Sequence, residues 1–280
     1  MPVSTARRPP EGAHSWVLLV LDSCRFDSFS RAKPKHLSAL GVVERRYAYA
    51  SWTAPSHYNL LLGLMPHPNA TRSFSADIYR AEYLRFRDRL GVDLDFADLL
   101  PELWLPSLLH ERGWHTGAWV SLPVLHPATP LSKGFDHYQL RTKPNDLRGI
   151  IEDLRFYIER PSFWLINSGE THYPYHRPDR IAPEAPRLSG LHGALRTASP
   201  SAITRFFTAS ELREMHDRQI EAVRYVDKQI EMLRDLVPDG TWLTVTADHG
   251  ECFGEGGFFG HGPVSHPRVF EVPFVEGRLR

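Results

Sequence analysis

The sequence predicts an α/β fold in which a doubly wound, mostly parallel β-sheet is flanked by helices. The first observation is that short apolar runs alternate with segments of helical periodicity, as in chains built from β-α-β units. The second is that the clearest runs, such as Trp16 to Leu21, are apolar throughout, which is typical of parallel strands covered on both faces. The composition agrees, because 42% apolar and 24% charged residues are ordinary values for a globular domain.

The amino-terminal part of the chain contains the first strands and helix of this pattern. It predicts a disordered lead-in at 1–14, a buried strand at 16–21 and a loop or short helix at 23–27. A weaker strand follows at 42–50, then a helix at 55–64 whose Pro55 suits a first turn, and a surface insertion without clear periodicity at 70–95.

The rest of the chain repeats the alternation. It predicts a helix at 99–112, a strand at 115–121, a second helix at 147–160 and a buried strand at 163–167. A long loop follows at 177–205, then a third helix at 211–236 and a last strand at 242–246. The third helix is the clearest, because apolar residues recur in it at helical spacing, namely Leu212, Met215, Val223, Val226, Ile230 and Leu233. The long loop is rich in Pro, Arg, Ser and Gly, and a lid over the functional site is one interpretation of it.

Charge and cysteine content restrict the partners and the compartment that we expect. The formal net charge is zero, so bulk electrostatics indicate neither a nucleic acid nor an anionic membrane as partner. Two cysteines, Cys24 and Cys252, form no disulfide framework and suit a reducing compartment. The polar amino-terminal residues lack a signal-peptide core, and the run 16–21 is too short to span a bilayer. We therefore expect a cytoplasmic protein without a membrane partner.

Two predicted strands end in carboxylates. Asp22 follows the first strand, and Asp248 with His249 follows the last, with His261 one glycine-rich loop later. In an open α/β sheet, residues beyond the carboxyl ends of different strands can meet. A single strand-terminal Asp is commonly a turn residue, but two of them with an adjacent His favour a divalent metal site.

A hydroxyl residue, Thr53, stands just ahead of the predicted helix that starts at Pro55. The local sequence favours an N-cap, the usual role of Thr in that position. The alternative is a metal-activated nucleophile, because coordination lowers the pKa of a hydroxyl group.

Further candidates lie in loops. His172 and His176 follow the strand at 163–167, where a His either serves function or hydrogen-bonds a backbone carbonyl. Lys133 either binds an anionic substrate or is an ordinary surface lysine. For other residues a structural role is favoured: an ion pair for Arg25 and Asp27, buried thiols rather than a redox pair for Cys24 and Cys252, and support of its neighbours for Glu251.

The order of these segments resembles the sulfatase-like branch of the alkaline phosphatase superfamily. The matching segments cover most of residues 15–276 in the order of the family, namely Val17 to Asp27, Thr53 to His57 with Leu60 to Gly63, Leu109 to Ser121, Gly134 to Tyr138, Thr171 to Tyr175, Thr246 to Gly262 and Val269 to Phe274. The resemblance implies an alkaline-phosphatase-like fold and a single sulfatase-like catalytic domain over 15–280, with insertions near 70–95 and 177–210.

The resemblance also implies a role for each candidate. Asp22, Asp248 and His249 would be metal ligands, and Thr53 would be both ligand and nucleophile. His172 and His261 would contact the anionic group of the substrate or protonate the leaving oxygen. We expect one divalent ion, Mn²⁺, Zn²⁺ or Mg²⁺, with Ca²⁺ disfavoured by an imidazole ligand. A second ion is the less favoured alternative, with His261 and either His172 or Glu170 as its ligands.

Departures from the family pattern restrict the chemistry. True sulfatases have a Cys or Ser, oxidised to formylglycine, where this chain has Thr53, and an Arg where it has His57. Their Asp-Asp and Asp-Asn pairs are Asp22-Ser23 and Asp248-His249 here. These differences favour hydrolysis or transfer of a small-molecule phosphate mono- or diester through a covalent intermediate. The alternatives are a sulfuric ester hydrolase and a catalytically silent metal-binding relative.

Overall fold

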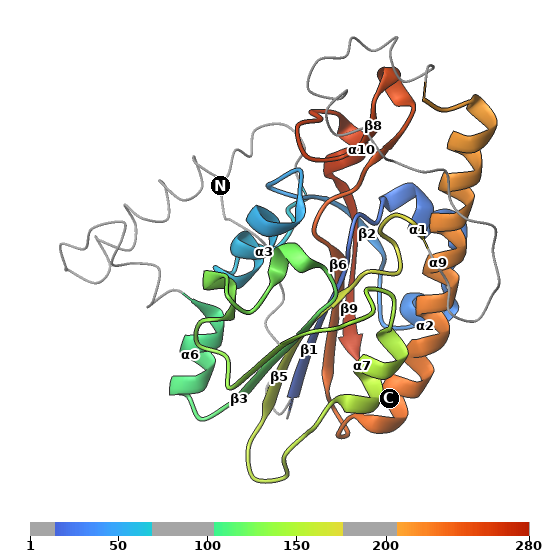
Figure 1. Cartoon of the computed structure of the whole chain (residues 1–280). Coiled ribbons are helices and arrows are strands. Elements are labelled where there is room, and N and C mark those ends of the chain that lie inside the picture. Colours follow the sequence, from blue (N-terminus) through green and yellow to red (C-terminus); the bar gives the residue numbers. More distant parts are fainter. Residues whose placement is uncertain (1–14, 69–103, 176–205, 280) are drawn as a thin grey trace.

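The computed structural model describes residues 15–68, 104–175 and 206–279, which are coloured by sequence in Figure 1. The predicted lead-in at 1–14, the insertion at 70–95, the loop at 177–205 and His176 lie outside the described residues.

A seven-stranded sheet forms the centre of the molecule. Its strands lie in the order β2-β9-β6-β1-β5-β3-β4. The five strands from β6 to β4 run parallel, whereas β9 pairs antiparallel with both β6 and β2. The predicted mostly parallel α/β sheet is therefore confirmed. The bounds are β1 Ser15–Leu21, β2 Glu44–Tyr47, β3 His115–Val120, β4 His137–Leu140, β5 Ser162–Ser168, β6 Trp242–Ala247 and β9 Glu271–Arg278.

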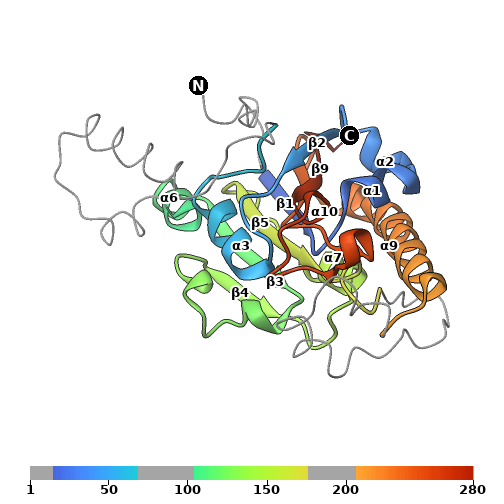
Figure 2. The same cartoon turned by 90° about the horizontal axis from the view of Figure 1, so that it is seen from above.

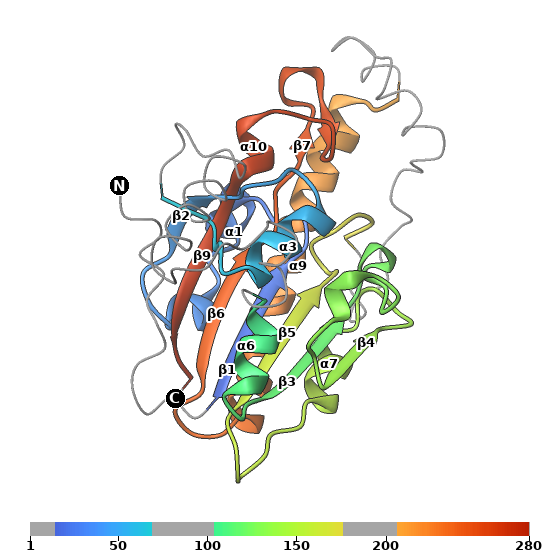
Figure 3. The ribbon, with the colours of Figure 1, turned by 90° about the vertical axis from the view of Figure 1, so that its left-hand side faces the viewer.

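Helices cover both faces of the sheet, as Figures 2 and 3 show. Helices α1 (Phe26–Ala32), α2 (Lys35–Ser38), α7 (Leu147–Asp153) and α9 (Ala209–Leu236) lie on one face, and α3 (Thr53–Leu61) and α6 (Leu105–Glu111) lie on the other. The central strand β1 supplies both cores by alternation. Val17, Leu19 and Leu21 join the core under α9, whereas Leu18 and Val20 join the core under α3.

A small hairpin and a short helix lie above the carboxyl ends of the parallel strands (Figure 1). They comprise β7 (Cys252–Phe253), the 3₁₀ turn η4 (Glu255–Gly257), β8 (Phe259–Gly260) and α10 (Pro267–Phe270). The buried Arg25 guanidinium anchors the hairpin, because it pairs with Glu255 at 2.6 Å and with Asp27 at 2.7 Å. The expected structural ion pair of Arg25 and Asp27 is thus present.

Several elements differ from the sequence-based expectation. The helix expected over 147–160 ends at Asp153, because Leu154 turns to an extended backbone and packs against the core. The weak strand expected at 42–50 contracts to β2. Strands β4 and β9 were not predicted, and β9 contains Pro273 and Gly277, which both weaken a strand pattern. None of the helices in the three described ranges combines the length and the apolar composition that crossing a bilayer requires.

Candidate metal centre and active site

Three buried side chains at two strand ends form the candidate metal centre. Asp22 directly follows β1, and Asp248 and His249 directly follow β6. Since Leu21 lies opposite Ala247 in the parallel pairing, these residues leave the sheet at the same edge. One potential ligand atom from each lies within 4.8 Å of the others. Two carboxylates and an imidazole suit Zn²⁺ or Mn²⁺, and the carboxylates also suit Mg²⁺.

The surroundings of Asp22 keep its carboxyl group ionised. The Asn167 side-chain amide donates to Asp22 Oδ2 at 2.9 Å, and the Ser23 hydroxyl donates to Oδ1 at 3.2 Å. Burial alone would raise the pKa of Asp22, but His172, His249 and the Asn167 hydrogen bond outweigh burial. The pKa therefore lies below its ordinary value of 3.8.

The pKa of Asp248 is shifted in the opposite direction. Its Oδ1 accepts hydrogen bonds from the backbone N–H groups of Ser23 at 3.1 Å and His249 at 2.9 Å. Its Oδ2 is buried and has no hydrogen-bond partner among the described residues. Burial and the neighbouring Asp22 raise the pKa of Asp248 well above 3.8. An unpaired buried carboxylate oxygen is costly, and a bound cation would remove that cost. The donor set and this free oxygen therefore fit a divalent metal.

The hydrogen bonds of His249 fix which ring nitrogen faces the centre. The Nδ1–H group donates to the Gly250 carbonyl oxygen at 2.8 Å, because that oxygen can only accept. The lone pair is then on Nε2, which lies 3.4 Å from Asp248 Oδ2. Burial and the nearby His261 hold the pKa of His249 well below 6.5, so the ring is neutral. A neutral imidazole with an oriented Nε2 is the form that binds metals.

The nucleophile candidate lies beside this nitrogen. Thr53 is the first residue of α3 and is buried, and its Oγ1 lies 3.3 Å from His249 Nε2. The N-cap position belongs to Trp52, which makes no side-chain capping bond. The N-cap interpretation of Thr53 is therefore wrong, and its hydroxyl faces the metal centre instead.

His57, one helical turn after Thr53, also reaches the centre. Its Nδ1–H donates to the Thr53 carbonyl oxygen at 2.8 Å, and the same nitrogen lies 3.8 Å from Asp248 Oδ2. Burial lowers the pKa of His57 despite the charge of Asp22, so the ring is neutral. The position that holds an Arg in true sulfatases is thus occupied by an uncharged group.

His172 and His261 extend the centre outward. The ring centroids of His249 and His261 lie 4.3 Å apart, and those of His261 and His172 lie 5.5 Å apart. The His172 Nδ1–H donates to the Tyr173 carbonyl oxygen at 2.8 Å, which leaves Nε2 available to a ligand. The His261 side chain is 24% exposed. The His261 ring thus lies beside both other rings, and His172 and His261 are partly exposed whereas His249 is buried.

Gln219 is a supporting residue that sequence reasoning missed. It is fully buried on α9, and its Nε2 lies within hydrogen-bond distance of three acceptors: the carbonyl oxygens of Ser23 at 2.9 Å and Thr171 at 3.1 Å, and Glu251 Oε1 at 2.9 Å. It thereby connects the loops that follow β1, β5 and β6. A signal was present, because Gln219 lies four residues after Met215 in the apolar stripe of its helix.

Asn167 is the second supporting residue that was missed. Its side chain accepts from the backbone N–H of Ser121 at 3.1 Å and donates to Asp22. Glu251 supports the centre as expected, since it accepts hydrogen bonds from the Tyr175 hydroxyl at 2.8 Å and from Gln219.

Two candidates are not brought to the metal ligands. The Glu170 carboxylate accepts from the backbone N–H of Leu147 and from the Ser168 hydroxyl, both at 2.6 Å, so it holds the start of α7. Lys133 is exposed, and its carbonyl oxygen accepts from the Trp104 indole at 2.7 Å. Lys133 lies on the segment that leads back to the start of β4. The start of this parallel strand is at the opposite end of the sheet from Asp22.

Cys24 and Cys252 are free and buried, as the favoured interpretation as buried thiols predicts.

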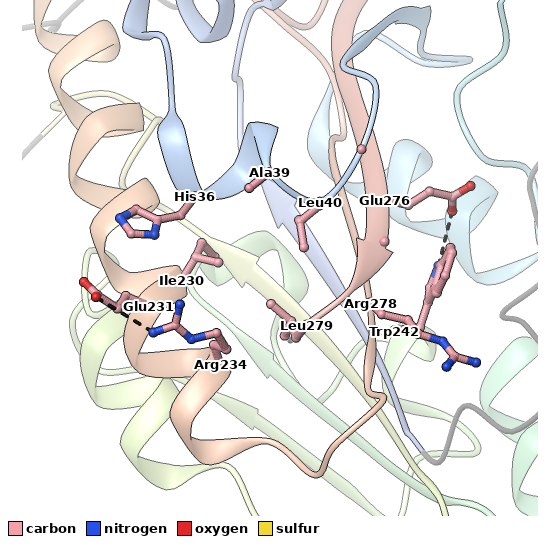
Figure 4. A pocket seen from close by; sticks show the side chains of 12 residues that line it. His36, Ala39, Leu40, Ile230, Glu231, Arg234, Trp242, Glu276, Arg278 and Leu279 are labelled. Atoms are coloured by element: carbon pink, nitrogen blue, oxygen red, sulfur yellow. Dashed lines mark hydrogen bonds and ion pairs between the residues drawn. The ribbon is translucent and has the colours of Figure 1, made fainter.

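A cavity of about 480 Å³ also lies at that opposite end. Figure 4 shows that it is bordered by the last turns of α9, the start of β6 and the end of β9. Several of its polar side chains are engaged with each other, since Arg234 faces Glu231 at 3.9 Å and the Trp242 indole donates to Glu276 at 3.4 Å. The candidate active site is therefore the carboxyl edge of the sheet, not this cavity.

Solved structures share this fold. The sequence matches no family model and no curated protein. The folded chain, however, is similar to a 2-O GAG sulfatase (TM-score 0.58, 16% identity, covering 96% of this chain and 65% of the other). It is equally similar to a phosphonate monoester hydrolase from Silicibacter pomeroyi (TM-score 0.58, 15% identity, covering 94% and 67%).

A third similar structure is the C-terminal periplasmic domain of EptC from Escherichia coli in complex with Zn (TM-score 0.55, 14% identity, covering 97% and 74%). The alkaline-phosphatase-like fold implied by the resemblance is thus confirmed. The chain spans 65% and 64% of the lengths of the first two solved structures that it matches, which are sulfatase structures.

The expected cytoplasmic location is contradicted by these comparisons. The similar structures include periplasmic domains of EptC from Escherichia coli and Campylobacter jejuni. The expectation depended on the cysteine content, on the lack of a signal-peptide core in the polar amino-terminal residues and on the short apolar run 16–21. The cysteine content does not record the compartment for this fold, because the described core is held by the sheet and its apolar clusters rather than by disulfides.

Proposed function

We propose that the chain catalyses metal-dependent hydrolysis or transfer of a phosphate mono- or diester, with Thr53 as the nucleophile. The observation that carries the proposal is the position of the Thr53 hydroxyl. It makes no capping bond and lies 3.3 Å from the lone-pair nitrogen of His249, which itself belongs to the buried cluster with Asp22 and Asp248.

In this proposal Asp22, Asp248, His249 and Thr53 hold one divalent ion. Such an ion, when bound, supplies Lewis acidity that lowers the pKa of the hydroxyl and stabilises charge on the transferred group. Thr53 Oγ1 loses its proton to solvent and forms a bond to phosphorus while the bond to the leaving oxygen breaks. The resulting Thr53 ester is then hydrolysed or passed to an acceptor.

His172 and His261 contact the anionic group or protonate the leaving oxygen. Both are partly exposed, whereas His249 is fully buried, so a substrate would reach these two rings first. If a second ion binds, these two histidines are its candidate ligands, whereas the Glu170 carboxylate is occupied by Leu147 and Ser168.

Phosphorus is favoured over sulfur for two reasons. Thr53 cannot be oxidised to the aldehyde that sulfatases use, and the neutral His57 replaces their Arg. The second candidate function is sulfuric ester hydrolysis, which the fold similarity to two sulfatases supports.

The test compares an aryl phosphate, a bis-aryl phosphate and an aryl sulfate in the presence of Mn²⁺, Zn²⁺ or Mg²⁺. We expect turnover of a phosphate ester, retained by Thr53→Ser and reduced at least about 10³-fold by Thr53→Ala. Ser56→Ala is a matched control, because that hydroxyl lies on the same helix and reaches only the Ala50 carbonyl oxygen at 3.4 Å.

Two outcomes would contradict the proposal. A clear preference for the aryl sulfate would favour the sulfatase function. A protein that binds no metal, and whose Thr53→Ala variant behaves like the wild type, would favour the catalytically silent relative.

A further inference from the structure

Two hydrogen bonds connect the segment before the nucleophile to the loop that carries His261. The Ser51 hydroxyl donates to the Gly262 carbonyl oxygen at 2.6 Å, and the Gly262 backbone N–H donates to the Ser51 carbonyl oxygen at 2.8 Å. Ser51 lies two residues before Thr53, and Gly262 directly follows His261. We call these contacts the Ser51–Gly262 pair.

The imidazole of His261 makes weaker contacts than this pair does. Its Nδ1 lies 3.5 Å from the Ser23 hydroxyl and 3.8 Å from Glu251 Oε2, both longer than a well-formed hydrogen bond. The ring centroids of His249 and His172 lie 4.3 Å and 5.5 Å from that of His261. On the carboxyl side of His261, the short contacts that locate it are therefore made by the backbone of the next residue.

The backbone around His261 would otherwise have considerable freedom. Gly260 and Gly262 both have positive φ angles, of 75° and 81°. A Cβ atom added at either position would meet nothing within 4 Å, so no side chain packs over these residues. Gly260 is held by its pairing with Cys252 in the hairpin, whereas Gly262 lies beyond that pairing. Glycines in open space lose conformational entropy on ordering, and hydrogen bonds must compensate for that loss.

We infer that Ser51 is a positioning residue, which acts through Gly262 to fix His261 relative to Thr53. The same hydrogen-bonded pair anchors the start of the nucleophile's helix and the loop of the histidine. The Thr53 hydroxyl and the His261 imidazole are therefore held in a fixed arrangement around the substrate. Precise placement of a catalytic group has large effects on rate, because a displacement of about 1 Å can cost about 10²-fold. This inference rests on the proposed function.

The test is a double-mutant cycle between Ser51→Ala and His261→Gln, measured on phenyl phosphate and diphenyl phosphate with the preferred metal. We expect Ser51→Ala to lower kcat by about tenfold, with KM and the metal Kd changed less than about twofold. In the His261→Gln background the same substitution should change kcat by less than about twofold, because a residue that acts only through His261 has nothing left to position. Ser51→Thr keeps the hydroxyl and should restore most of the rate.

Matched controls separate positioning from a general loss of stability. Ser56→Ala removes a buried hydroxyl from the same region and should leave kcat unchanged. If Ser51→Ala does not fold, Gly262→Ala replaces it in the cycle, since Ala is strained at a φ of 81°. Gly63→Ala then serves as the strain control, because Gly63 has a φ of 82° and equally open space at the end of α3.

Two results would overturn the inference. One is an undiminished effect of Ser51→Ala in the His261→Gln background, which would make the two losses multiply. The other is a Ser51→Ala variant with wild-type kcat. Either result leaves the proposed function standing, whereas unchanged turnover by Thr53→Ala refutes that function and is measured independently.

Discussion

Replacing Asp248 by Asn should stabilise the metal-free protein and abolish most of its response to metal. The substitution keeps the size of the side chain. The Asn oxygen can still accept from the Ser23 and His249 backbone N–H groups. The new amide nitrogen would stand where Oδ2 now lies without a partner, 3.4 Å from the lone pair of His249 Nε2. The substitution therefore removes a buried charge and supplies a donor to a free acceptor.

The geometry sets the size of this effect. Charges on Asp22 and Asp248 no more than 4.8 Å apart repel by about 3.5 kcal/mol or more at an effective dielectric constant of about 20. Protonation of Asp248 limits the cost, since holding a proton at pH 7 against an ordinary pKa of 3.8 costs about 4 kcal/mol. The hydrogen bonds to Asp248 favour its ionised form, so they offset part of the repulsion or of the cost of protonation. We expect a gain of about 1–3 kcal/mol, which raises Tm by roughly 2–5 °C.

Metal should reduce or reverse this difference in stability. At a metal concentration of about 100 times Kd, the wild type gains about 2.7 kcal/mol of unfolding free energy. A Kd weakened about a hundredfold by the loss of one ligand leaves the variant a gain of only about 0.4 kcal/mol. In thermal unfolding with chelator the variant should melt higher than the wild type, and the difference should shrink or change sign when metal is added.

Asp227→Asn is the matched control for this experiment. Asp227 is also buried, but its two oxygens accept from the backbone N–H groups of Lys35 and Leu37, each at 2.8 Å. Its replacement should cost about 1–3 kcal/mol and leave the metal response intact. The reasoning is refuted if Asp248→Asn lowers Tm in chelator while the metal-induced shift keeps its wild-type size.

Three further predictions concern the surroundings of the centre. Gln219→Leu removes the side-chain donor of the Ser23 and Thr171 carbonyl oxygens and leaves Glu251 with only the Tyr175 hydroxyl of its two described side-chain donors, so it should lower the unfolding free energy by about 3 kcal/mol or more in denaturant titrations and weaken metal binding in calorimetry. The pKa of Asp248 lies above 3.8 in the folded protein, so the metal-free fold should lose stability as pH rises through the window above 3.8, while the metal affinity measured by calorimetry rises over the same window. Lys133→Ala should leave KM for a phosphate ester unchanged in steady-state kinetics, because Lys133 lies at the far end of the sheet.

The sequence allowed the fold and the centre of the site to be predicted for the same reason. Parallel strands buried on both faces are continuous apolar runs, so their ends are visible in the sequence, and Asp22 and Asp248 stand at two such ends. The topology then requires these ends to meet. The nucleophile role of Thr53 was identified only as an alternative. The local sequence could not distinguish it from an N-cap role, since the two roles differ only in where the hydroxyl points.

The remaining features depend on tertiary contacts that have no local pattern. Lys133 precedes a turn, and only the direction of β4 shows that this turn lies at the wrong end of the sheet. Strand β9 was missed because Pro273 and Gly277 disrupt its pattern. It is stable nonetheless, because it pairs with strands on both sides and Pro273 contributes a carbonyl oxygen that accepts from Thr246. Glu170 resembled a metal ligand, but its role follows from the position of α7.

The charges at the centre require that a cation binds before an anionic substrate does. Asp22 is ionised, and His249 and His57 are neutral. Among the described residues, the buried guanidinium of Arg25 is already compensated by Asp27 and Glu255. A phosphate ester that approached the metal-free centre would therefore meet a net negative site. A divalent ion cancels this negative charge, even when Asp248 is ionised as well, and it offers the substrate oxygens a cation to contact. One binding event thus completes the ligand set and removes the repulsion of the substrate, so the metal should bind first and the ester second.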